Sequence, residues 1–297
     1  MPGAPQGESL ATWGMWAVVL VVILVTYWRL PPDTRLATDD LYHVSGNGVV
    51  GGLSRVLIEA NFPMAVVGGL LVLVALDALP RRAWLVAAPA IALCAFVGWP
   101  GVVDQDDLDA RWVNVVPALG VALALALTVS AAQRAGRHPA GPLSLDRVRI
   151  GIAVVVLVLS IPWIAADLGF FLPDGIFIMR RVAPDSDSSP IAAVHLGHHH
   201  GMDGTLVALS ALLLSRPRLR PGSTAAVTLA CTSVAFAYGM VNCVQDTWNE
   251  QLVKRGWLDW KIPSAIYPKL AWIWLGILLL GALTAVVLRR ESSSTTA

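Results

Sequence analysis

The sequence predicts an all-α integral membrane protein, a single domain over residues 1–297 built as a bundle of about eight transmembrane helices. Hydrophobic residues make up 56% of the chain and charged residues 14%, whereas soluble domains carry about 25% charge. The mean hydropathy is +0.66. The apolar residues fall in blocks of roughly 16 to 24, the length that crosses a bilayer as a helix. These observations exclude a soluble globular protein.

Charged or Pro/Gly-rich segments separate the apolar blocks and set the ends of each predicted span. The blocks predict spans at about residues 13–29, 62–79, 83–100, 112–132, 149–167, 196–215, 223–243 and 267–288. No small-residue cleavage pattern accompanies the first block. We therefore interpret it as a retained helix rather than a signal peptide.

The connections between the spans differ in charge and length. The second, fourth and sixth are short and basic, and two arginines follow the last span; these basic residues are Arg81, Arg82, Arg134, Arg137, Arg147, Arg149, Arg216, Arg218, Arg220, Arg289 and Arg290. Short basic loops stay in the cytoplasm. The pattern predicts a multi-pass protein of the cell membrane with both termini cytoplasmic and the long loops, 30–61, 168–195 and 244–266, on the extracytoplasmic side.

Several classes of function are disfavoured. The net charge is +1, so no overall field indicates a nucleic-acid partner. The sequence contains no Walker loop, no His-Glu-x-x-His, no Gly-x-Ser-x-Gly and no dinucleotide fingerprint. Cys231 and Cys243 lie twelve residues apart on one predicted helix and cannot pair, so no disulfide framework is expected.

A histidine-rich stretch precedes the sixth span. On a helix, His195, His199 and Asp203 fall within an arc of about 80°. Two imidazoles four residues apart with a carboxylate one turn further suit Zn²⁺. We therefore predict zinc as a cofactor, held by His195 and His199 with either Asp203 or His43. A hydrated histidine-rich boundary, or a hydrogen bond from His199 to Asp203 that only fixes the helix, is the alternative interpretation.

The opposite side of the same helix carries small residues, Gly197, Gly201 and Gly204. Small residues let two membrane helices approach closely. We therefore expect a neighbouring helix to pack on this face.

A polar stripe marks the outer end of the seventh span. If the helix continues to residue 250, five polar residues lie within about 100° of one another; they are Tyr238, Asn242, Gln245, Asp246 and Asn249, with Glu250 adjacent. Intramembrane polar residues of this kind face cavities or the bundle interior. The alternative is a helix that ends near Cys243, followed by a solvated loop.

A third polar cluster precedes the second span. Arg55 and Glu59 lie four residues apart in an apolar setting, which favours a structural ion pair. Glu59 could equally be a proton-accepting carboxylate. Asp39 and His43 share the same spacing, but the glycines at 46, 48, 51 and 52 disfavour a continuous helix there.

These features favour a metal-dependent hydrolase that acts on a lipid or lipid-linked substrate at the outer membrane face. Zinc-bound water would attack an ester or amide carbonyl, and Glu250, Asp246 or Glu59 would take the proton. A transporter or metal/proton pathway is one alternative. A non-catalytic membrane subunit or assembly factor, whose outer loops bind a partner, is the other; the sequence names no protein partner.

Overall fold

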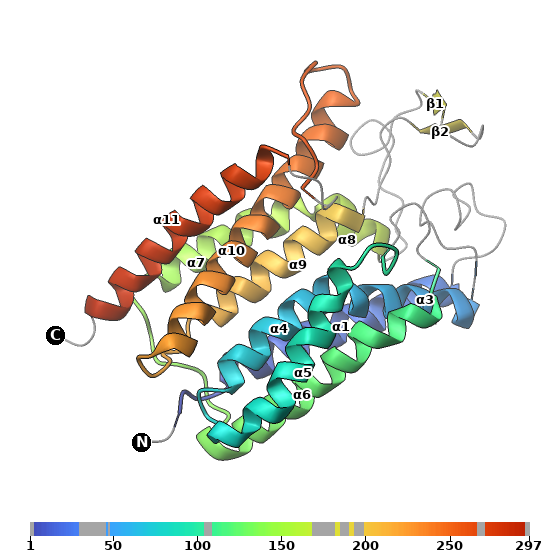
Figure 1. Cartoon of the computed structure of the whole chain (residues 1–297). Helices are drawn as coiled ribbons and strands as arrows, with labels where there is room; N and C mark the ends of the chain where they lie inside the picture. Colours follow the sequence, from blue (N-terminus) through green and yellow to red (C-terminus); the bar gives the residue numbers. More distant parts are fainter. Residues whose placement is uncertain are drawn as a thin grey trace.

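The computed structural model describes residues 3–29, 46, 48–103, 109–167, 182–184, 190–192, 199–265 and 271–294. This part of the chain forms a helical bundle (Figure 1). Its α-helices are α1 (Gly7–Arg29), α3 (Gly48–Asn61), α4 (Pro63–Ala75), α5 (Trp84–Ala95), α6 (Val115–Ala135), α7 (Asp146–Leu159), α8 (Ile161–Asp167), α9 (His199–Leu214), α10 (Ser223–Asp246) and α11 (Ile273–Ser294).

Shorter elements connect or extend these helices. Three 3₁₀ turns are η1 (Arg81–Ala83), η2 (Phe96–Gly98) and η3 (Trp112–Asn114), and a π-helix, η4 (Thr247–Val253), continues α10. The strands β1 (Val182–Pro184) and β2 (Pro190–Ala192) pair antiparallel. The chain is therefore helical in architecture, as its composition predicts.

Several helices are long and apolar enough to cross a membrane, which indicates a multi-pass membrane protein. Among the described residues there are five of them, and six if the bent pair α3 and α4 forms one span. They are Gly7–Trp28, Arg81–Gly98, Trp112–Ala135, Ser223–Val253 and Ile273–Ser292. The predicted spans 149–167 and 196–215 correspond to α7 with α8, and to α9, each of which is a shorter helix.

The second predicted span begins earlier than its apolar block suggests. Helix α3 starts at Gly48 and meets α4 at an angle of 44°. The bend lies at Phe62, directly before Pro63, because proline disfavours helical backbone in the residue before it and lacks an N–H to donate. The predicted span 62–79 therefore begins where α4 begins, and the structure adds α3 before it.

Glycines do not prevent α3 from forming. Gly52 lies against the α1 backbone, where an added Cβ would stand 2.8 Å from the carbonyl oxygen of Leu24. Only a residue without a side chain permits this approach. The packing of α3 on α1 thus outweighs the low helix propensity of glycine.

The bundle consists of two groups of helices. Helices α1, α3, α4, α5 and α6 pack on one another, as do α9, α10 and α11, and contacts of α4 with α9 and α10 join the groups. Two buried tryptophans of α1 reach across the bundle: the Trp16 indole donates a hydrogen bond to Ser210 Oγ of α9 at 3.0 Å, and that of Trp13 to Thr128 Oγ1 of α6 at 3.2 Å. Such bonds satisfy polar groups that would otherwise be buried without partners.

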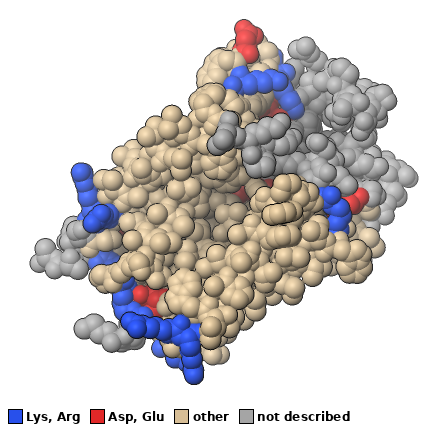
Figure 2. Space-filling view, viewed as in Figure 1, with Lys and Arg blue, Asp and Glu red and all other residues tan. Residues whose placement is uncertain are grey.

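The basic residues that the sequence places in short connections meet at one end of the bundle. Both termini lie there, and Figure 2 shows blue side chains at this end as well as at the opposite one. We call it the arginine end. Its charged residues within the described chain are the eleven arginines named above and four acids, Glu8, Asp77, Asp146 and Glu291. We call the opposite end, where α1 ends and η4 lies, the loop end.

Candidate functional site

The polar stripe of α10 stays helical. α10 runs to Asp246 and continues as the π-helix η4 to Val253, so the alternative of a helix ending near Cys243 is wrong. Asp246 is 4% exposed and Glu250 6% exposed. Single π-helical turns occur often at functional sites, and buried carboxylates in a membrane helix are a functional-site hypothesis by default.

Asp246 is held between three helices. It is hydrogen bonded to the side chain of Trp163 on α8 and to the backbone of Gly201 near the start of α9. Its Oδ2 has no hydrogen-bond partner among the described residues. The positive end of the α9 dipole favours an anionic group at this position. Asp246 is thus a buried carboxyl group with one oxygen available to a ligand.

Gly201 makes this arrangement possible. A Cβ added at Gly201 would overlap the Trp163 ring and lie 2.6 Å from Asp246 Oδ2. One turn further, Gly204 and Gly239 bring α9 and α10 together, since a Cβ at Gly204 would lie 2.8 Å from the Gly239 carbonyl oxygen. The expectation that a helix packs closely on the face with Gly201 and Gly204 is confirmed.

Glu250 lies one helical turn beyond Asp246. Its Oε2 forms an ion pair with Lys254 Nζ at 2.8 Å, and its carboxylate is within electrostatic range of Asp246. The two carboxyl groups and the ammonium therefore form one charged cluster at the end of the long helix.

Two other members of the stripe support the loop after η4 instead. The Asn249 side chain donates a hydrogen bond to the carbonyl oxygen of Ile262 at 3.0 Å and accepts one from its N–H at 3.1 Å. Gln245 Nε2 donates to the same carbonyl at 3.5 Å. The Trp248 indole donates to the Trp260 carbonyl oxygen at 3.0 Å. These hydrogen bonds hold the loop against η4. Asp246 and Glu250 therefore remain the members of the stripe that are candidates for catalysis.

Asp203 occupies a different side of α9. It is buried and lies within electrostatic range of Tyr238, whose ring stacks on Trp274 of α11 at a centroid distance of 5.7 Å. Gly201, which contacts Asp246, precedes Asp203 by two residues, and two residues on a helix differ by about 200°. Asp203 thus lies on a different side of α9 from Gly201, the residue that contacts Asp246 of α10.

Two of the four predicted zinc ligands lie outside the described residues. His43 and His195 belong to undescribed residues, and His199 is described only as the first residue of α9. Among the described side chains, no group of three or more His, Cys, Asp or Glu is arranged to hold a metal ion. Zinc binding by His195, His199, Asp203 and His43 therefore stays a prediction.

The predicted ion pair of α3 is confirmed. Arg55 Nη2 and Glu59 Oε1 lie 2.6 Å apart, and both side chains are buried. Helix α3 packs chiefly on α1, α4 and α6, so Glu59 belongs to the other group of helices from Asp246. Its proposed role as a proton acceptor is thus separate from the α10 cluster.

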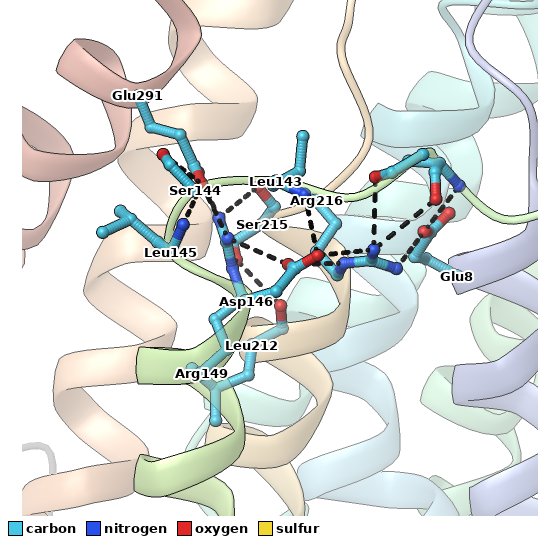
Figure 3. A network of polar contacts seen from close by, with 12 residues as sticks. Glu8, Leu143, Ser144, Leu145, Asp146, Arg149, Leu212, Ser215, Arg216 and Glu291 are labelled. Atoms are coloured by element: carbon cyan, nitrogen blue, oxygen red, sulfur yellow. Dashed lines mark hydrogen bonds and ion pairs between the residues drawn. The ribbon is translucent and has the colours of Figure 1, made fainter.

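Sequence reasoning missed a charge network at the arginine end (Figure 3). Arg216, which follows α9, donates from Nη1 to Glu8 Oε1 at 2.7 Å and from Nε to Asp146 Oδ1 at 3.0 Å. Arg149 of α7 donates from Nη2 to Glu291 Oε2 at 2.6 Å. From the sequence, these arginines predicted only which connections lie in the cytoplasm. Pairing them required knowing which helix ends are neighbours.

The network changes the acidity of its members outside the membrane spans. The Arg216 guanidinium, by hydrogen bond and charge, holds the pKa of Asp146 below its usual range. Asp146 in turn raises the pKa of Arg216. A second pair, Asp77 with Arg220, lies 3.2 Å apart, and Asp77 Oδ2 accepts a hydrogen bond from the Ala4 N–H at 2.7 Å. These contacts tie the N-terminal segment to the rest of the arginine end.

Comparison with protein-family models, with curated proteins and with solved structures finds no match to this chain. The functional proposal below is therefore based on the chemistry and geometry of the residues themselves.

Proposed function

We propose that the protein is a membrane-embedded hydrolase whose site lies at the loop end and acts on a lipid or lipid-linked substrate. The observation that supports this most directly is the buried carboxyl pair. Asp246 and Glu250 lie four residues apart and are 4% and 6% exposed, and Asp246 contacts Gly201 near the start of α9. Neighbouring carboxyl groups suit proton transfer, since one can give a proton while the other takes one.

The chain's own residues perform the proton steps of this mechanism. One carboxyl group of the pair accepts the proton of the attacking water, and the other gives a proton to the leaving group. Trp163 and the Gly201 N–H fix the orientation of Asp246, and Lys254 fixes Glu250 at 2.8 Å. Fixed orientation is what makes general acid–base catalysis efficient.

Zinc is the proposed metal. His195, His199 and Asp203 would hold it, with His43 as the alternative to Asp203. The donor chemistry fits, because Asp203 is buried and follows His199 by four residues on α9. When bound, zinc supplies a polarised water or carbonyl. Asp203 projects from another side of α9 than the one Asp246 contacts, so the metal set and the carboxyl pair are tested separately.

The depth of the site indicates the substrate class. Asp246 and Glu250 belong to the apolar segment Ser223–Val253, which is long enough to span a membrane. A site in the last turns of such a helix lies at the depth of lipid headgroups. Lipids and lipid-linked molecules reach this depth by lateral diffusion, whereas a water-soluble substrate must leave water to do so.

The proposal is tested with purified protein in vesicles that contain ester-linked and amide-linked lipids, with released fatty acid as the readout. We expect release by the wild type and by Asp259→Asn, an exposed acid at the same end, and at least a hundredfold loss in Asp246→Asn and Glu250→Gln. Equal rates in Asp246→Asn and wild type would overturn the acid–base role. Absence of release from every lipid would overturn the hydrolase.

Metal content is measured on the same preparations. We expect about one zinc per chain in the wild type and none in the double variant His195→Ala/His199→Ala. Zinc that persists in the double variant, or its absence from wild-type protein purified without chelators, would overturn the metal assignment. Glu59→Gln is included because its carboxylate, in an ion pair with Arg55, is the third predicted proton acceptor.

The topology of eight spans with cytoplasmic termini is part of the proposal. α7 with α8, and α9, would supply the spans beyond the six long or bent ones. The grouping of eleven arginines at one end supports this end as cytoplasmic. A fluorescent protein fused to the C-terminus should fold and fluoresce in cells. An alkaline phosphatase fused at the same place should be inactive; the reverse pattern would contradict the orientation.

A proton pathway is the second candidate function. Two buried hydroxyl groups continue the polar face of α10 toward the arginine end; they belong to Thr228 and Thr232. Thr232 lines a cavity that also contacts Arg149. If protons follow this route, the interior of vesicles that contain the protein should acidify when a membrane potential is applied. Asp246→Asn and Thr232→Val should both slow this acidification. Acid release that depends on lipid hydrolysis would favour the first candidate instead.

A further inference from the structure

A cavity of about 190 Å³ lies between α7, α9, α10 and α11 near the arginine end. Apolar side chains form most of its wall, including Ile152 of α7, Phe236 of α10 and Val287 of α11. Arg149 bounds the cavity, and its guanidinium is paired with Glu291 at 2.6 Å. The cavity is therefore an apolar space that adjoins the arginine-end network.

The cavity has exposed lining residues on both α7 and α11. α11 packs on α10, and α7 packs chiefly on α9, so α7 and α11 are neighbours mainly at the network. There Glu291 accepts hydrogen bonds from Arg149 and from the Leu145 N–H. Two residues that line the cavity are also exposed, Val148 of α7 by 54% and Leu283 of α11 by 60%. These exposed apolar residues mark a lateral mouth between the two helices.

Positive charge flanks this mouth. Arg147 directly precedes the lining residue Val148, and Arg290 follows the exposed lining residue Leu283 by seven residues, which puts it on the same side of α11; both arginines are exposed. The arginine end as a whole carries eleven arginines and four acids within the described chain. Each of those acids already forms an ion pair with an arginine. The excess of positive charge thus attracts anionic headgroups of the adjacent leaflet.

We propose that this cavity binds one acyl chain of an anionic phospholipid, whose phosphate lies against Arg147 and Arg290. The apolar wall accommodates the chain, and the flanking guanidinium groups select the charge of the headgroup. The lipid comes from the leaflet at the arginine end. This site is distinct from the proposed hydrolytic site, because the carboxyl pair lies at the opposite end of α10.

The proposal is tested by native mass spectrometry of the detergent-purified full chain. Phosphatidylglycerol or phosphatidylcholine with identical acyl chains is added at equal concentration. We expect the wild type to retain one phosphatidylglycerol with at least fivefold higher occupancy than phosphatidylcholine. Equal retention of the two lipids would overturn the role of the arginines.

Two sets of variants locate the site. Thr284→Trp and Val287→Trp place a large ring at the wall of the cavity, and we expect each to reduce phosphatidylglycerol occupancy at least fivefold. The control Leu275→Trp carries the same ring on an exposed part of α11 away from the cavity. Val287 is part-exposed, so its variant should fold even if Thr284→Trp does not. Unchanged occupancy in Val287→Trp would overturn the cavity as the site.

The charge variants complete the test. Arg147→Gln/Arg290→Gln should abolish the preference for phosphatidylglycerol while phosphatidylcholine retention stays at its low level. The control Arg81→Gln/Arg82→Gln removes two exposed charges elsewhere at the same end and should keep the preference. Loss of the preference in both double variants would show a general effect of net charge and overturn the assignment to Arg147 and Arg290.

Discussion

Arg149 at the start of α7 and Glu291 near the end of α11 form a buried ion pair with 2.6 Å between Nη2 and Oε2, although 142 residues separate them in the chain. Glu291 also accepts a hydrogen bond from the Leu145 N–H at 2.7 Å. One carboxylate therefore holds the last helix to the first turn of α7. Its partner Arg149 bounds the apolar cavity from the side of the arginine end.

Removing this carboxylate should destabilise the protein. In Glu291→Ala the guanidinium of Arg149 stays buried and loses its closest partner, and breaking a buried pair in this way costs about 3 kcal/mol. Arg149 keeps a weaker contact with Asp146 at 3.3 Å. We expect a lower melting temperature in detergent for Glu291→Ala. The exposed Arg137 at the same end provides the control, since Arg137→Ala should leave the melting temperature unchanged; equal effects would contradict the importance of the pair.

The pH dependence of stability tests the pair of Arg216 and Asp146. Arg216 lowers the pKa of Asp146 in the folded protein. The resulting stabilisation is complete above the unfolded-state pKa of about 3.9 and is lost as the pH falls through the lower folded-state pKa. We expect the wild-type melting temperature to decline on acidification below about pH 4.

The Arg216→Gln variant should show a flatter acid limb in the same thermal scans, because Asp146 then titrates at similar pH in both states. Arg137→Gln removes an exposed charge from the same end and should keep the wild-type profile. If Arg216→Gln and the wild type lose stability in parallel, the pair does not control the acid limb.

The contact of α9 with α10 depends on glycine. In Gly204→Ala the new Cβ would lie 2.8 Å from the Gly239 carbonyl oxygen and 2.9 Å from Asn242 Cβ. Overpacking of this kind costs about 1–3 kcal/mol. Gly276→Ala on α11 meets no atom within 4 Å and should be neutral or stabilising, since alanine favours helix by up to about 1 kcal/mol. Melting temperatures of the two variants give the comparison, and a neutral Gly204→Ala would refute the close contact.

Asp246→Asn should separate function from stability. The amide keeps the shape and the acceptor oxygen beside Trp163 and Gly201, and it removes an ionisable group from a buried position. Burial disfavours the charged form of a carboxyl group, so a neutral group of the same shape is expected to be tolerated there. We expect an unchanged or raised melting temperature together with loss of lipid hydrolysis. Unfolding of the variant would indicate that the carboxylate serves the structure.

A double substitution distinguishes the two roles of Glu59. Glu59→Leu alone leaves the Arg55 guanidinium buried without its partner at 2.6 Å and should lower stability by about 3 kcal/mol. Arg55→Met/Glu59→Leu replaces the pair with apolar groups and should recover most of that loss. If the recovered protein also retains activity, Glu59 is structural; if it is stable and inactive, Glu59 takes part in the reaction.

The helices α1, α5, α6, α10 and α11 could be predicted because a long apolar segment in a bilayer satisfies its backbone hydrogen bonds by forming a helix. The face of α9 that packs closely on its neighbour could also be predicted, from the spacing of Gly201 and Gly204. The bent pair α3 and α4 could not, because the sequence showed four glycines and an apolar block that starts at Phe62. Helix packing on α1 forms α3 in spite of those glycines, and this contact is made with a distant segment.

The site shows the same division. The spacing of Asp246 and Glu250 on one helix is a property of the sequence. The contacts of Asp246 with Trp163 and Gly201 come from two other helices, which no spacing along α10 reveals. Asn249 and Gln245 shared the predicted stripe, yet both bond to Ile262, because the following loop folds back onto η4.

The sequence by itself determined that this chain has several helices long and apolar enough to cross a membrane and that its arginines lie in the connections between them, since apolar length and short basic loops are local properties. The tertiary structure decided which charges meet. Glu291 finds Arg149, Glu8 finds Arg216 and Asp77 finds Arg220, because helix packing brings separate ends together and buried charges are stable only in pairs. It also decided that the last helix leaves an apolar cavity beside one of those pairs.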